Sequence, residues 1–192
     1  MAKKIVLGGL AGSVAVFLIS MIFHMVTQLG EMGVKAFPNE DAVMSMMRSS
    51  ITESGMYIFP GADMSDKSAA AQAAYAAKYK QGPTGILVLT MGGKDLQFGR
   101  LLLNQYLMNL IAALLIAWIL AITARATTYG SRVLIVFLAA LAGGVIYSVP
   151  YWNWYGFPAA YTAGDVGSWV VSWTVGGLVM AAIVKEKAAA AA

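Results

Sequence analysis

Polar residues recur at helical spacing in the first apolar stretch of this chain. Five of them share one face of a helix, provided that the helix continues as far as the last one. His24, the third of the five, is the only histidine in the chain. Such a stripe faces other helices or a polar path instead of lipid. The five residues are Ser13, Ser20, His24, Thr27 and Glu31.

Three interpretations of His24 remain open. The structural one is a hydrogen bond to a neighbouring helix or to the interface. In the second, His24 ligates haem or copper with help from the flanking Met21 and Met25. A b-type haem usually needs a second histidine, which only another chain or a second copy could supply. The third is a proton relay between His24 and Glu31. Haem and copper are thus the candidate cofactors, but nothing in the sequence requires either.

Amides and one carboxylate add polar groups to later apolar stretches. Gln105 and Asn109 share one face of the second stretch, and Asp165 stands at the start of the fourth, where it could cap a helix. Buried amides in lipid usually hold helices together. They could also line a path for a solute. We predict a polar intramembrane face formed by Ser13, Ser20, His24, Thr27, Glu31, Gln105, Asn109 and Asp165.

Signatures of catalysis are missing from the sequence. It has no phosphate-binding glycine loop, no nucleophile elbow and no pair of histidines. It also has no cysteine, which removes thiolate metal sites. Ser20, His24 and Glu31 would form a line along one helix and would not converge on a substrate atom. We therefore predict no catalytic residue and no metal site.

Four long apolar runs must position these residues. Of the 192 residues, 59% are hydrophobic and 11% are charged, whereas a soluble domain carries roughly a quarter charged residues. The runs are long enough for a hydrocarbon core of ~30 Å. We predict an all-α polytopic membrane protein with transmembrane helices at about 5–27, 101–123, 133–149 and 166–184.

The segment 28–99 differs in composition from the apolar runs, because it contains seven acidic and six basic residues. We predict that it is a small α/β extracytoplasmic insertion between the first two membrane helices. A two-stranded sheet is marginal alone, so the insertion would rest on the membrane helices or on a partner. Its predicted elements are a helix after Asn39, strands at 56–59 and 86–90, and an Ala-rich helix from Ser65 to about Lys80.

The basic residues of the termini and the short loops lie on one side of the predicted spans, and the short turn 150–164 on the other side contains none. By the positive-inside rule, both termini are cytoplasmic and 28–99 faces outward from a bacterial inner membrane. Amphipathic aromatic side chains favour the headgroup layer, and the predicted interface anchors are Tyr151, Trp152, Trp154, Tyr155 and Trp169. The basic residues are Lys3, Lys4, Arg125, Arg132, Lys185 and Lys187.

The predicted organisation is helix one at 1–27, the insertion at 28–99, three helices within 100–187 and an alanine tail at 188–192. It favours a non-catalytic subunit or accessory protein of an inner-membrane complex, such as an energy-transducing one. Docking would use the outer domain and small-residue helix faces. A small channel or transporter lined by the polar face is the alternative, and a haem-, copper- or pigment-binding protein that uses His24 is the second.

The predicted partners are the lipid bilayer and either other membrane subunits or further copies of the chain. Nucleic acid is not a predicted partner. The net charge of +4 is small, and no basic stripe is interleaved with aromatic residues.

Overall fold

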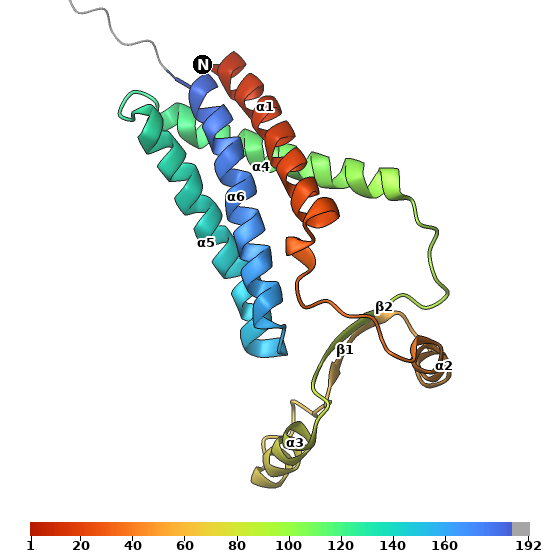
Figure 1. The fold of residues 1–192 in the computed structure, drawn as a ribbon. Helices are drawn as coiled ribbons and strands as arrows, with labels where there is room; N and C mark the ends of the chain where they lie inside the picture. Colours follow the sequence, from red (N-terminus) through yellow and green to blue (C-terminus); the bar gives the residue numbers. More distant parts are fainter. Residues whose placement is uncertain (186–192) are drawn as a thin grey trace, which may run out of the picture. The chain divides into compact units, whose positions relative to one another are not determined.

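Four long helices form the main part of the structure (Figure 1), a computed structural model that describes residues 1–185. Each is long and apolar enough to cross a membrane, judged by length and composition, and this confirms the mostly helical fold with four candidate spans. Lys187 and the predicted alanine tail at 188–192 lie outside the described residues. The helices are α1 (Ala2–Met21), α4 (Phe98–Thr123), α5 (Tyr129–Tyr155) and α6 (Ala159–Ile183).

The chain divides into two compact units. The first, here called the membrane unit, contains Met1–Gly33, Gln97–Val149 and the chain from Pro158 onward. The second, here called the polar unit, contains Val34–Leu96 together with Pro150–Phe157. The long helices belong to the membrane unit except for the end of α5 from Pro150 onward, and so does every buried residue among those described.

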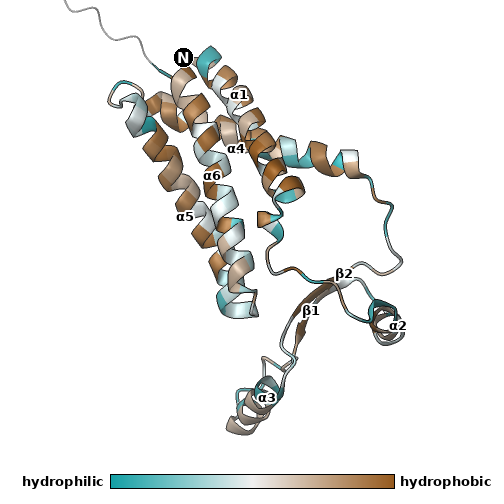
Figure 2. Cartoon of the chain, in the orientation of Figure 1, coloured by the Kyte–Doolittle hydropathy of each residue, from teal (hydrophilic) through white to brown (hydrophobic). Residues whose placement is uncertain are grey.

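The surface of the membrane unit carries many large apolar side chains, and brown, hydrophobic segments recur along its long helices, most clearly on α5 (Figure 2). Large aliphatic side chains remain on the surface: Ile111 is 62% exposed, Ile122 is 73% exposed and Ile146 is 74% exposed. In water, a continuous apolar surface of this size would promote aggregation. In lipid it costs nothing, and the helices keep their backbone hydrogen bonds internal. The surface therefore suits a membrane-embedded protein.

Helix α1 packs closely against α6 because glycines occupy the contact. A Cβ added at Gly12 would lie 2.4 Å from Cγ of Met180, and one added at Gly176 would lie 2.5 Å from Cγ2 of Val16. Both distances are shorter than van der Waals contact. The two helices run antiparallel, since residues early in α1 meet residues late in α6. In lipid this close fit supplies dispersion energy that the hydrophobic effect cannot supply between helices.

Helix α1 also contacts α4, which crosses it obliquely (Figure 1). A Cβ at Gly9 would lie 2.5 Å from Cδ2 of Leu114, and the rings of Phe17 and Tyr106 meet edge to face with centroids 5.7 Å apart. On the other side, Gly177 of α6 lies against Val136 of α5. The buried core shared by the four helices includes Val16, Ala113, Ala117, Leu120, Val136, Ala140, Trp173 and Met180.

The third span does not end at Pro150, as the sequence had suggested. Helix α5 continues through this proline to Tyr155, because one missing N–H near a helix end is a tolerable loss when the surrounding turns are kept. The chain then turns at Gly156, whose φ of 71° lies in the left-handed region that favours glycine. The predicted turn 150–164 is thus mostly helical, and only three residues separate α5 from α6.

The polar unit contains a β-hairpin and two short helices. Strands β1 (Gly55–Phe59) and β2 (Gly85–Leu89) confirm the two predicted strands, and they pair antiparallel. Helix α2 (Glu40–Ser50) begins where Asn39 Oδ1 accepts the Ala42 N–H, at 3.4 Å. None of residues 34–96 is buried. The hairpin therefore has no core of its own.

Helix α3 (Ala69–Gln81) begins four residues later than predicted. The Ser68 hydroxyl accepts the Ala71 N–H at 3.1 Å and acts as the N-cap. Asp66 accepts the Ser68 N–H at 2.9 Å, in the turn that precedes the helix. This hydrogen bond from the backbone favours the ionised carboxylate and lowers the pKa of Asp66 below its ordinary value. Asp66 therefore shapes the turn and does not begin the helix.

We predict that Gly176→Ala will lower the free energy of unfolding by about 1–3 kcal/mol, because the added methyl would clash with the stiff side chain of Val16. Gly167→Ala is the matched control in the same helix, since nothing lies within 4 Å of its Cβ position. Helix propensity should make the control neutral or slightly more stable. Unfolding of the purified protein in detergent would measure both. Equal effects of the two substitutions would contradict this account of the α1–α6 contact.

Candidate functional site

His24 lies just after the regular part of the first helix. Helix α1 ends at Met21 and is followed by a π-helical turn, Ile22–Val26. His24 Nδ1 is 2.9 Å from the carbonyl oxygen of Ser20, and because a carbonyl only accepts, Nδ1–H is the donor. Wide π-helical turns often occur at functional positions. Here the turn holds the imidazole by one bond to its own helix.

A tight turn fits between His24 and α6. Gln28 has a left-handed φ of 56°, and the turn Leu29–Glu31 follows it. A Cβ at Gly30 would be 2.6 Å from His24 Nε2, and a Cβ at Gly164 of α6 would clash with the carbonyl of Leu29. The two glycines therefore allow the turn to lie against the imidazole on one side and α6 on the other. Gly30 lies close to Nε2, the ring nitrogen that does not bond to Ser20.

The polar stripe predicted for the first helix is not continuous. The π-turn and the left-handed Gln28 end the regular helix before Glu31, so Glu31 does not extend the face on which Ser13 and Ser20 lie. The Ser13 hydroxyl donates to the Leu10 carbonyl at 2.9 Å, and the Thr27 hydroxyl donates to the Phe23 carbonyl at 3.1 Å. Hydroxyls satisfied by their own helix suit packing in lipid. Because these hydroxyls are already bonded, fewer polar groups remain to line a path for a solute.

Asp165 belongs to a cluster of polar side chains where α5 meets α6. The buried Ser148 of α5 donates a hydrogen bond from its hydroxyl to the Asp165 carboxylate. Asp165, Tyr147 and Glu31 are all close enough to Tyr161 to interact with it electrostatically. Asp165 lies in the second turn of α6 and not at its first residue, because α6 begins at Ala159. It therefore links two helices instead of capping one.

The predicted amide pair on α4 is formed, but one of its groups is unsatisfied. Gln105 Nε2 donates to Asn109 Oδ1 at 3.1 Å. Asn109 is only 5% exposed, and its Nδ2 is a fully buried side-chain nitrogen without a hydrogen-bond partner in residues 1–185. A buried unpaired donor costs about 1–3 kcal/mol. A partner molecule could satisfy it.

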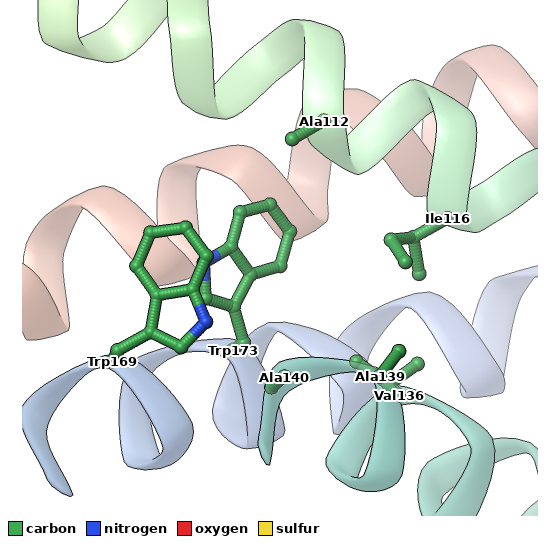
Figure 3. Close-up of a pocket in the computed structure, with 7 residues that line it drawn as sticks. All are labelled: Ala112, Ile116, Val136, Ala139, Ala140, Trp169 and Trp173. Carbon is green, nitrogen blue, oxygen red and sulfur yellow. The ribbon is translucent and has the colours of Figure 1, made fainter. Parts of the chain in front are cut away.

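A small apolar cavity lies between α4, α5 and α6. Its volume is about 110 Å³, whereas sites for small-molecule ligands usually enclose roughly 300–1,000 Å³. Figure 3 shows the indoles of Trp169 and Trp173 on one side and Ile116 on the other. The cavity is large enough for one apolar side chain or part of an acyl chain. The lining residues are Ala112, Ile116, Val136, Ala139, Ala140, Trp169 and Trp173.

The predicted aromatic anchors divide into two groups. Trp152 and Trp154 are exposed near the end of α5, and the Tyr151 ring packs against Tyr155, with centroids 5.9 Å apart. Trp169 instead lies ten residues into α6, where its ring is 5.7 Å from that of Trp173. At ~1.5 Å per residue this is roughly 15 Å from the start of the helix. Trp169 therefore contributes to the cavity.

Basic side chains meet at the opposite end of the membrane unit. Lys4 donates from Nζ to the Lys185 carbonyl, which joins the start of α1 to the end of α6. Arg132 of α5 donates from Nε to the Ala181 carbonyl at 3.3 Å, and Tyr129 donates from its hydroxyl to the Leu178 carbonyl at 3.2 Å. These donors satisfy carbonyls in the last turns of α6, where cations are favoured.

Glu31 and Asp165 are the only carboxylates of the membrane unit among its described residues, and they lie at the end opposite to this basic end. Residues 1–185 contain no group of three or more His, Asp or Glu side chains placed to hold a metal ion. His24 thus stands apart from any such group. What the arrangement can do is hold helices together, separate charge between its two ends and offer apolar contact surface.

Ser148 and Tyr161 were not predicted as site residues. One signal could have found Ser148: it and Asp165 are equally distant along the chain from the turn at Gly156 and Phe157. In an antiparallel pair of helices, such residues lie opposite each other. These equal distances can be recognised only when the turn is assigned to Gly156 and Phe157, whereas Pro150 indicated an earlier turn.

Comparisons with models of known protein families, with curated proteins and with solved structures found no match to this chain. Its function must therefore be argued from the residues themselves.

We predict that Asp165 acts as a hydrogen-bond acceptor between α5 and α6. Asp165→Asn keeps an oxygen for the Ser148 hydroxyl and should unfold like the native protein. Asp165→Leu removes the acceptor and should lower the free energy of unfolding by about 1–3 kcal/mol, because Ser148 is buried. Unfolding in detergent would compare the two variants. Equal destabilisation by both would show that the negative charge itself is needed.

Proposed function

We propose that this chain is a non-catalytic integral membrane subunit or accessory protein of a bacterial inner-membrane complex, such as an energy-transducing one. It docks to its partners through the polar unit. The observation that carries the proposal is the absence of any buried residue in 34–96, although this segment forms a hairpin and two helices. A two-stranded sheet needs further cover to be stable in water. Another protein would supply it.

One face of the hairpin supports this proposal most directly. In the antiparallel register Met56 lies opposite Val88, and Ile58 lies opposite Ile86, so these four side chains share a face. Met56 is 64% exposed, Ile58 is 52% exposed and Val88 is 72% exposed. The hairpin is brown in Figure 2 for this reason. An exposed apolar face on a short sheet marks a surface for protein contact.

Methionines on α2 support the same proposal. Met44 and Met46 are exposed, while Val43 and Met47 are only half-buried. Flexible methionine side chains adapt to partner surfaces and are common where proteins bind one another. In the membrane unit, the apolar cavity beside Trp169 and Trp173 offers space for a side chain of a neighbouring helix.

The common position of the basic side chains supports an orientation with the termini in the cytoplasm. Lys4, Arg132 and Lys185 gather at one end of the helices, and positively charged loops are retained on the cytoplasmic side. In this orientation the polar unit is extracytoplasmic, and its partners are reached from outside the membrane.

We predict that the double substitution Met56→Ser and Val88→Ser will reduce co-purification of partner subunits at least several-fold, because it removes the largest exposed apolar area of the hairpin. Native purification from the membrane followed by mass spectrometry would measure this. Met64→Ser is the matched control, since Met64 is 75% exposed but lies outside the hairpin. The melting temperature of the membrane unit should be unchanged in both.

The same partners in the hairpin variant and in the native protein would contradict docking through this face. The mass of the detergent-solubilised complex would distinguish further copies of this chain from other subunits, because a homo-oligomer contains only this chain. The whole proposal fails if the purified chain, free of partners, transports a solute or catalyses a reaction.

A small channel or transporter is the second candidate, and the unpaired Nδ2 of Asn109 favours it. A buried amide with a free donor could bind a solute in transit. We predict that proteoliposomes with the native chain and those with Asn109→Leu will both show the ion flux of protein-free vesicles, because the amide serves packing and not transport. Ile111→Ala, on the exposed side of the same helix, is the control. Flux through the native chain that Asn109→Leu abolishes would establish the second candidate instead.

A further inference from the structure

Arg132 is a buried basic residue, and within residues 1–185 its side chain donates to two backbone carbonyls. It is only 5% exposed. Its Nε donates to the Ala181 carbonyl at 3.3 Å, and its Nη1 donates to the Thr127 carbonyl at 2.7 Å. A guanidinium has five N–H donors, so these two bonds leave three. No hydrogen bond from the third nitrogen, Nη2, is found within residues 1–185. The only fully buried side-chain nitrogen or oxygen without a partner there is Asn109 Nδ2, so Nη2 is not fully buried.

The positive charge around Arg132 is not neutralised within the described part of the membrane unit. Both of its described carboxylates lie at the opposite end of the helices. A helix C-terminus carries roughly half a negative charge, which cannot balance Arg132 and Lys4 together at the end of α6. Lys3 adds charge at the same end, because α1 begins there. Among the described residues, this end of the membrane unit is thus positively charged.

The depth of Arg132 along α5 matches the headgroup layer of a bilayer. Helix α5 has 27 residues, and at ~1.5 Å per residue it is roughly 40 Å long, about 10 Å longer than the hydrocarbon core. Arg132 is in its first turn, three residues after Tyr129, where α5 begins. With the excess length shared between the two ends of α5, its first turn lies where the hydrocarbon core meets the headgroups.

We propose that Arg132 binds the phosphate of an anionic phospholipid headgroup. Its two carbonyl bonds fix the orientation of the guanidinium, and Nη2 keeps its donors for a phosphate. A planar guanidinium binds phosphate more specifically than a lysine ammonium does. The nearby Lys4 selects anionic lipids, because the same positive charge repels the cation of a zwitterionic headgroup. The site is separate from the polar unit and is independent of the proposed docking function.

The test uses the full-length chain in detergent and measures lipid binding by native mass spectrometry. Phosphatidylglycerol is titrated against phosphatidylcholine with the same acyl chains. The native protein should bind phosphatidylglycerol about tenfold more tightly than phosphatidylcholine. Arg132→Gln should weaken the binding of phosphatidylglycerol by about tenfold, as expected for loss of one charge-assisted contact. Inorganic phosphate at millimolar concentration should not displace the lipid.

Two further variants separate a specific site from general attraction. Lys3→Gln removes one charge from the same end, but Lys3 is exposed, so its effect should stay within about threefold. Arg132→Lys keeps the charge and loses the planar fork, and its affinity should lie between those of the native protein and Arg132→Gln. If Arg132→Gln does not fold, the comparison of Arg132→Lys with Lys3→Gln decides the question.

Three results would overturn the proposal. The first is an equal effect of the Arg132 and Lys3 substitutions, which would show charge attraction without a site. The second is equal affinity for the two lipids. The third is displacement by inorganic phosphate, which would identify a site for soluble phosphate instead of lipid.

Discussion

The close approach of α1 to α6 and α4 is the contact on which the membrane unit depends. Lipid removes the hydrophobic force between helices, so association must come from dispersion and from hydrogen bonds. Glycines at positions 9, 12 and 176 let the backbones approach until side chains such as Met180 and Val16 fill the space. With α1 held between α4 and α6, the start of α1 meets the end of α6, and the charges at the two ends of the bundle follow from that arrangement.

Polar groups in the membrane unit are used mainly to satisfy the backbone and to join helices. Ser13, Thr27 and Ser172 bond to carbonyls of their own helices, whereas Ser148 and Arg132 each bond to a different helix. Such hydrogen bonds, within one helix and between helices, are typical of closely packed membrane helices. Asn109 departs from the pattern, because one of its donors has no partner in the described chain. The polar unit departs from it in a different way, since its hairpin leaves an apolar face uncovered.

Local features were predictable where neighbouring residues decide them. Asn39 begins a helix because its own side chain caps it, and both strands were recognised by β-branched and aromatic residues next to glycine and proline. Pro150 misled the prediction of the third span, since a proline near a helix end removes one hydrogen bond without ending the helix. The predicted stripe does not extend to Glu31 for a related reason: the backbone at Gln28 adopts a left-handed conformation that side-chain spacing does not reveal.

The sequence by itself determined four apolar helices, the polar character of the segment 28–99 and the common side of the basic residues in the short loops, because hydropathy and charge act residue by residue. Only the tertiary structure decided that Ser148 meets Asp165, that Gly30 lies close to His24 and that Arg132 is buried against the end of α6. Each of these contacts joins residues from different elements, or from an element and the turn that folds back on it. Their positions depend on how closely helices approach and where turns fall, and those are properties of packing that no single stretch of sequence carries.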